Sequence, residues 1–121
     1  MFSLTANHRY FFYPFPTDMR KSFDTLSGIV TNQMGMNVQN GDAFIFANRT
    51  LTNLKVLHAE YGGLVIYNLR LERGRLQLPA VSDAEVATFK YKINFSDLVS
   101  MVRIAEAESH KSPSHWKCKP K

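Results

Sequence analysis

The stretch AFIFANRTLTNLKVLHAEYGGLVIYNLRLE, residues 43–72, decides the fold of this chain. It holds three runs rich in aliphatic and aromatic residues, at 43–49, 54–61 and 64–72, which predict three strands. The polar TLTN and the GG pair between them are too short for a parallel crossover. The stretch therefore predicts an antiparallel meander.

Strands are also predicted on either side of the meander. RYFFY (9–13) is a short aromatic run that ends at proline, and LQLP (76–79) reads as a short strand stopped by Pro79. The segment VSDAEVATFKYKI (81–93) is ambiguous.

Two helices are predicted from apolar periodicity. Residues 18–34 carry apolar side chains at helical steps, with Thr17 or Asp18 as the N-terminal cap and Gly35 as the end. The apolar stripe of this helix is Met19, Phe23, Leu26, Val30 and Met34. Residues 95–108 form the second helix, capped by Ser96. Its expected buried side is Leu98, Val99, Val102 and Ile104–Ala105. Together the elements predict an α+β fold, in which an antiparallel meander has two helices packed on one face, in the order β-α-β-β-β-(β)-α.

Composition is that of a folded protein. The chain has 121 residues, 45% of them apolar and 12% aromatic, which is enough for a hydrophobic core. Cys118 is the single cysteine, so an internal disulfide is excluded and a reducing compartment is expected. No run approaches the length of a membrane span and no secretory signal opens the chain, so we expect a soluble cytoplasmic protein.

Positive charge is concentrated at the C-terminus. Residues 1–108 carry 11 Lys and Arg against all 10 Asp and Glu, whereas residues 109–121 carry four lysines and no acid. We therefore expect a single domain over 1–108 and a basic, disordered tail over 109–121. The nearly neutral domain gives only weak support for nucleic-acid binding by bulk charge.

Catalytic motifs are absent from the sequence, which contains no HExxH, GxxxxGK[ST], GxSxG or GxGxxG pattern. The acidic residues are scattered rather than grouped for two-metal chemistry. His110, His115 and Cys118 lack a fourth metal ligand, and His58 is expected to be structural or at the surface. We therefore expect no enzyme activity, no catalytic residue, no metal and no cofactor.

Charged residues around the meander and the first helix are the candidates for contact with a partner. Arginine forks suit phosphates and carboxylates alike, so these residues either bind DNA or protein or serve only as solvated charges. Arg49 and Lys55 are expected at one end of the sheet, and Arg73 and Arg75 at another loop. The candidate set is Arg20, Lys21, Asp24, Arg49, Lys55, Arg70, Arg73 and Arg75.

Several stretches together resemble a known family. They are HRYFFYP (8–14), TDMRKSFDTLSGIV (17–30), GDAFIFANR (41–49), LKVLH (54–58) and GGLVIYNLRLERG (62–74). In this order they resemble the Orf2-like (TnpB) accessory proteins of the insertion-sequence-66 family of bacterial transposons. The resemblance covers roughly residues 4–78, and DMRKSFD is its most specific part.

The resemblance implies a non-catalytic role in transposition, because such elements encode a separate, larger transposase that carries the acidic catalytic residues. The matching positions are Asp18, Met19, Arg20, Lys21, Phe23, Asp24, Arg49, Lys55, Arg70, Glu72, Arg73 and Gly74. The chain departs from the family at TLTN (50–53), where further basic residues and an Asp-Arg pair are usual, and at Ala59, where a tryptophan is usual.

Three functions follow as hypotheses. The first is an accessory protein that binds the transposase of the same element, the DNA of the element, or both. The second is a homo-oligomeric interaction module without DNA binding, paired through a sheet edge. The third is a small nuclease or hydrolase with an unfamiliar motif, which the scattered acids disfavour.

Overall fold

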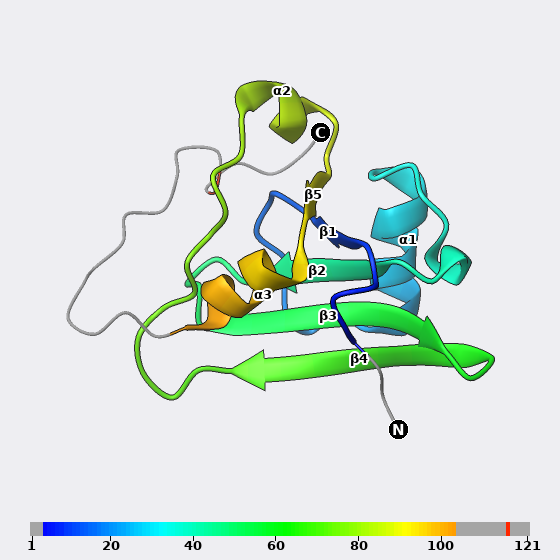
Figure 1. Ribbon diagram of the computed structural model, residues 1–121, viewed down its shortest axis with the longest axis horizontal. Helices are drawn as coiled ribbons and strands as arrows, with labels where there is room; N and C mark the ends of the chain where they lie inside the picture. The colour runs from blue at the N-terminus through cyan, green and yellow to red at the C-terminus, as the bar shows by residue number, and fades with distance from the viewer. Residues whose placement is uncertain (1–3, 104–115, 117–121) are drawn as a thin grey trace.

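A five-stranded sheet with helices on both faces makes up the fold (Figure 1). The computed structural model describes residues 4–103 and 116. The strands are β1 (Tyr10–Phe12), β2 (Ala43–Ala47), β3 (Asn53–Glu60), β4 (Gly63–Arg70) and β5 (Tyr91–Ile93). The helices are α1 (Phe23–Asn32), α2 (Asp83–Ala87) and α3 (Phe95–Val102), with a short 3-10 turn at Val38–Asn40. None of these helices is long and apolar enough to cross a membrane.

The predicted meander is confirmed. β2, β3 and β4 pair antiparallel in sequence order, and the sheet order is β4-β3-β2-β1-β5. Tyr61 and Gly62 connect β3 to β4 and have φ values of 53° and 76°. Positive φ at both central residues is the hairpin geometry that matches strand twist, and Gly62 adopts it without a steric penalty. β1 pairs parallel with β2 and antiparallel with β5, which completes an α+β sheet.

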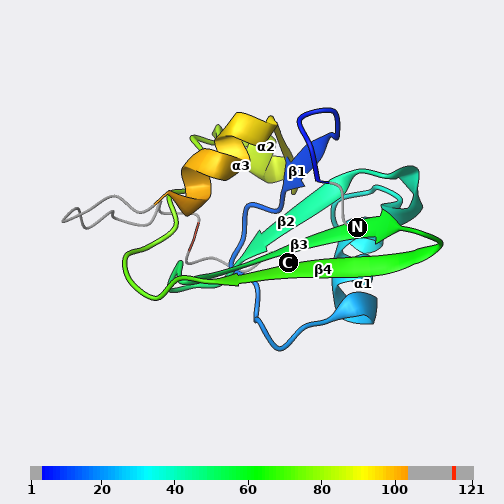
Figure 2. The same ribbon diagram turned by 60° about the horizontal axis from the view of Figure 1, so that its bottom comes forward.

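Two apolar clusters cover opposite faces of the sheet, and Figure 2 shows α1 and α3 on these opposite sides. In the α1-side core, Leu26 and Val30 of α1 pack over Phe44 and other sheet residues. In the α3-side core, Leu98 and Met101 of α3 pack over the opposite face. The expected fold class and element order are confirmed, but the helices lie on opposite faces and not together on one.

The two central strands, β1 and β2, explain why helices cover both faces of the sheet. β1 and β2 are apolar and buried at every position, not at alternate ones. Since successive side chains of a strand point to opposite faces, both faces of these strands need a cover.

The first helix begins later than predicted. Thr17 donates its backbone N–H to the carbonyl of Ala47 at 2.8 Å, so the chain follows the end of the sheet before it turns into α1 at Phe23. The prediction that Phe23 is in the core is therefore wrong, because its side chain is 43% exposed, and Met19 is only half-buried. Asp18 does not cap the helix, and Ser22 holds the N-cap position.

The segment after the meander also differs from the prediction. Residues 76–79 form no strand. Leu76 and Gln77 instead donate their backbone N–H groups to the carbonyls of Leu51 and Met101. The ambiguous segment contains α2 and β5.

The helix predicted over 95–108 is α3. Its cap is Asn94, which forms a capping box with Asp97, and not Ser96. Val99, expected to be buried, is 40% exposed. Ile104–Ala105 lie outside the described residues.

Trp116 is the described residue of the predicted tail. It is fully buried in the α3-side core, where its ring stacks on Phe12 with centroids 5.9 Å apart. Its Nε1–H donates to the carbonyl of Arg49 at 3.2 Å. The neighbouring residues 104–115 and 117–121, including Cys118, His110 and His115, lie outside the described part, so the domain boundary at 108 stays a prediction.

Candidate functional site

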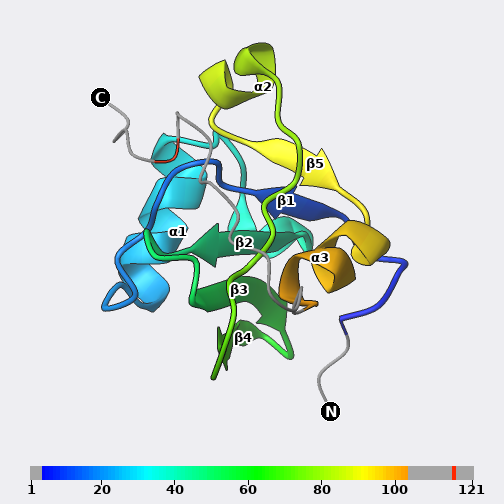
Figure 3. The same cartoon turned by 90° about the vertical axis from the view of Figure 1, so that its left-hand side faces the viewer.

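Three separate segments that carry basic residues lie at one end of the sheet, where β2 and β4 end and β3 begins (Figure 3). We call this surface the basic end. Its members are Arg20, Lys21, Arg49, Lys55, Arg70, Arg73 and Arg75. Asp24, the acidic residue of the predicted site, is exposed on the first turn of α1.

Backbone hydrogen bonds bring these segments together around the β2–β3 loop, residues 48–52. Leu71 donates its N–H to the carbonyl of Thr52 at 2.8 Å, and Leu76 donates to the carbonyl of Leu51 at 2.7 Å. These bonds place residues 71–76, with Arg73 and Arg75, beside the loop that carries Arg49. Arg73 and Arg75 therefore join the end that holds Arg49 and Lys55, whereas sequence reasoning assigned them to another loop.

The β2–β3 loop is held rigidly by its own side chains. Asn48 Oδ1 accepts the backbone N–H groups of Thr52 and Asn53 at 2.9 and 3.0 Å. Leu51 has a φ of 60°, which is rare for a residue with a branched side chain, and it is buried in the α3-side core. The TLTN segment thus uses its polar groups inside the loop and leaves Arg49 exposed to solvent.

Lys55 connects β3 to the segment of the basic end that precedes α1. Its Nζ donates to the carbonyl of Lys21 at 2.6 Å, and its side chain is half-buried on the α1 side of β3. A charge-assisted bond to a carbonyl is stronger than a neutral one. Lys55 thereby fixes the position of Lys21 and of the start of α1.

Arg20 is neutralised by a neighbour. Its Nε and Nη2 both donate to Asp18 Oδ2, at 3.0 and 2.6 Å, and Nε also donates to Asp18 Oδ1. The Arg20 hydrogen bonds hold the pKa of Asp18 well below its ordinary value, and Asp18 in turn raises the pKa of Arg20. The pair therefore stays ionised at neutral pH, and Arg20 adds little net charge to the basic end.

Four arginines remain exposed. Arg49, Arg70, Arg73 and Arg75 take part in none of the ion pairs between described residues. A hollow of about 390 Å³ lies between Arg49 and the 16–19 segment, and the residues that line it include Thr17, Asp18 and Thr50. Arg49, which is basic, and Asp18, which is acidic, both line this hollow.

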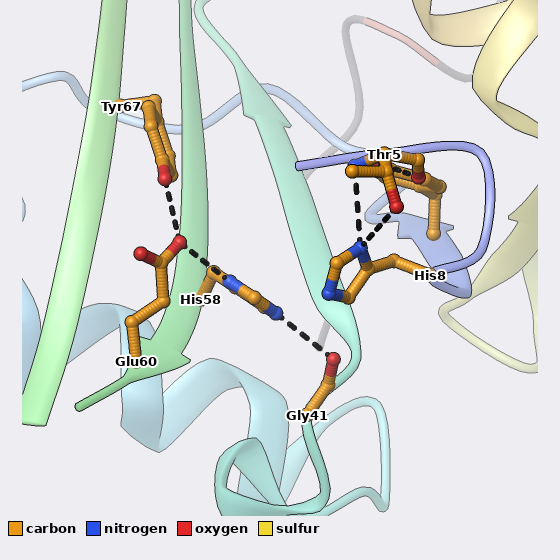
Figure 4. Close-up of polar contacts among 7 residues, drawn as sticks. Thr5, His8, Gly41, His58, Glu60 and Tyr67 are labelled. Carbon is orange, nitrogen blue, oxygen red and sulfur yellow. Dashed lines mark hydrogen bonds and ion pairs between the residues drawn. The ribbon is translucent and has the colours of Figure 1, made fainter. Parts of the chain in front are cut away.

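A buried polar cluster lies away from the basic end, toward the opposite end of β3 (Figure 4). His58 Nε2 donates to the carbonyl of Gly41 at 3.0 Å, and His58 Nδ1 lies 2.8 Å from Glu60 Oε2. Tyr67 donates its hydroxyl to the same carboxylate oxygen at 2.5 Å. The His8 ring meets that of His58 edge-on, with centroids 4.8 Å apart.

This cluster is structural in its geometry. His58 is 3% exposed and Glu60 9%, so the pair has little access to solvent. The sequence analysis noted His58 but missed Glu60 as its partner and Tyr67 as the hydrogen-bond donor to Glu60. The available signal was the i, i+2 spacing of His58 and Glu60, which places both side chains on one face of the strand. Among residues 4–103 and 116, no group of three or more His, Cys, Asp and Glu side chains could hold a metal ion.

Comparison with known proteins gives one family and one relative. Residues 8–109 match the family model described as IS66 Orf2 like protein. The chain is 29% identical over 79 residues to the uncharacterized protein y4hO of Sinorhizobium fredii (strain NBRC 101917 / NGR234). That match covers 65% of this chain and 69% of the relative. No solved structure matches the chain.

Proposed function

Because the chain belongs to the IS66 Orf2-like family, we propose that this transposition accessory protein acts by binding the DNA of its element through the basic end. It performs no covalent chemistry itself, and the separate transposase cuts and joins the DNA. A cytoplasmic location accompanies this role.

The observation that supports DNA as the ligand is the convergence of four exposed arginines around a rigid loop. Guanidinium groups bind phosphate oxygens with two parallel hydrogen bonds, and a fixed scaffold lowers the entropy lost on binding. Arg49 stands on the loop that Asn48 holds in place, and Arg73 and Arg75 lie beside it. This arrangement supports contact with successive phosphates and not recognition of base edges.

The transposase of the same element is the second candidate partner. Phe23 is 43% exposed next to the carboxylate of Asp24 on the first turn of α1. An exposed aromatic ring beside an acid suits a protein surface, because the acid repels phosphate. Salt distinguishes the two partners, since phosphate contacts weaken steeply as salt rises and an apolar protein interface does not.

Replacing the four exposed arginines by alanine tests the proposal. DNA affinity is expected to fall at least tenfold, and the slope of log K against log salt should fall by about 0.9 for each lost phosphate contact. Fluorescence anisotropy with a labelled duplex of the element end measures both quantities. Arg49→Ala alone is compared with Lys92→Ala, which removes an exposed cation from β5 at the other edge of the sheet. Unchanged affinity in the quadruple variant, with circular dichroism like that of the wild type, would reject DNA binding by this surface.

Asp18→Asn is expected to strengthen DNA binding. The change keeps the side-chain size but removes the carboxylate that neutralises Arg20, so the guanidinium becomes available to a phosphate. We expect affinity to rise by about two- to fivefold at low salt. Asp83→Asn, on α2, is the matched control for loss of one negative charge. An equal gain in both variants would show that net charge and not release of Arg20 is responsible.

A further inference from the structure

The outer edge of β4 is a long strand edge without a partner strand among the described residues. The sheet begins at β4 and ends at β5, and β4 has eight residues whereas β5 has three (Figure 1). All eight residues of β4 are in register with β3, from Gly63 opposite Glu60 to Arg70 opposite Asn53, without a bulge. The strand therefore offers a regular row of backbone donors and acceptors to another strand.

The usual protections of an edge strand are missing from β4. Its sequence GLVIYNLR contains no proline, and its one charged residue is Arg70 at the end. Natural edge strands avoid pairing through proline, bulges, or central lysine residues. Such an unprotected edge indicates a strand that is paired in the assembled protein.

The side chains of β4 are also incompletely covered. Leu64 and Ile66 point to the α1 side, where they pack against the α1-side core but stay only half-buried. Helix α1 packs over β3, the neighbour of β4 in the sheet. A neighbouring strand in the same plane would cover both residues.

We infer that β4 pairs antiparallel with β4 of a second copy of this chain, in a register centred on Ile66. A twofold axis perpendicular to the sheet keeps the α1 sides of both copies on one face, so Ile66 meets Ile66 of the second copy. Arg70 then lies opposite Gly62 of the second copy, which has no side chain. A parallel pair related by a twofold axis along the strands would instead put the α1 sides of the two copies on opposite faces of the joined sheet. The β4–β4 pair closes on itself and gives a dimer.

This inference is independent of DNA binding by the basic end. Static light scattering after size exclusion, over a range of protein concentrations, is expected to give a dimer for the wild type. Ile66→Lys brings two like charges together at the twofold axis and is expected to give a monomer with an unchanged circular dichroism spectrum. Thr31→Lys, at an exposed position of α1, is the matched control and should remain dimeric.

Disulfide trapping tests the register. In a Cys118→Ser background, Ile66→Cys places two thiols opposite each other, within the Cα separation that a disulfide allows. Asn68→Cys places the two thiols four residues apart along the pair, about 13 Å, which is too far. We expect oxidised dimers from Ile66→Cys and none from Asn68→Cys. A wild type that is monomeric at all concentrations, a dimeric Ile66→Lys variant, or equal trapping at both positions would overturn the inference.

Discussion

Trp116→Ala is expected to lower the free energy of unfolding by about 3–5 kcal/mol. The indole is fully buried, stacks on Phe12 at an interplanar angle of 14° and donates to the carbonyl of Arg49. Truncation removes the aromatic surface from the α3-side core, leaves a cavity and deprives a loop carbonyl of its donor. Urea denaturation followed by circular dichroism measures the change.

Trp116→Phe separates the two contributions. Phenylalanine retains most of the stacking on Phe12 but lacks the N–H that binds Arg49, so a loss of about 1–2 kcal/mol is expected. If Trp116→Ala unfolds at the same urea concentration as the wild type, the indole does not belong to the core and the C-terminal segment can be removed without penalty.

His58→Leu is expected to destabilise the fold by about 3–5 kcal/mol, because it removes one member of a buried, hydrogen-bonded pair. His58 Nδ1 lies 2.8 Å from Glu60 Oε2, and His58 Nε2–H donates to the carbonyl of Gly41. Leucine fills a similar volume but leaves the Gly41 carbonyl without this donor and weakens the support of the Glu60 carboxylate. Thermal and urea unfolding report the loss.

A double-mutant cycle provides the control. Glu60→Gln keeps the volume and removes the carboxylate, and the double variant His58→Leu/Glu60→Gln should be more stable than the sum of the two single losses predicts. We expect a coupling of about 1–3 kcal/mol between the two residues. Strict additivity would show that His58 and Glu60 act separately and would contradict the contact seen in Figure 4.

The sequence was sufficient for the meander because its turns are short and local. Such short connections leave antiparallel pairing as the only geometry, and alternation along β4 puts Leu64 and Ile66 on one face and Leu69 on the other. The start of α1 could not be predicted from the sequence, because the apolar spacing of Met19 and Phe23 continues the helical period. The hydrogen bond from Thr17 to β2, which holds this segment out of the helix, is a long-range contact.

The basic end was predictable residue by residue but not as one surface. Exposure of Arg70 on β4 follows from strand alternation. The meeting of Arg73 and Arg75 with Arg49 depends on the bonds of Leu71 and Leu76 to the β2–β3 loop, which no local pattern encodes. The sequence also did not predict the burial of Trp116, because the residues around this single aromatic side chain are rich in lysine and proline.

The central position of β1 has a consequence for synthesis on the ribosome. β1 precedes β2 and β5 in the chain but lies between them in the sheet, so its second edge stays open until Ile93 has left the exit tunnel. Phe12 gains its stacking partner only when Trp116, far along the chain, has been synthesised. Because these pairings join residues that are far apart in the chain, we expect the aromatic strand β1 to stay exposed to aggregation until β5 and Trp116 are available.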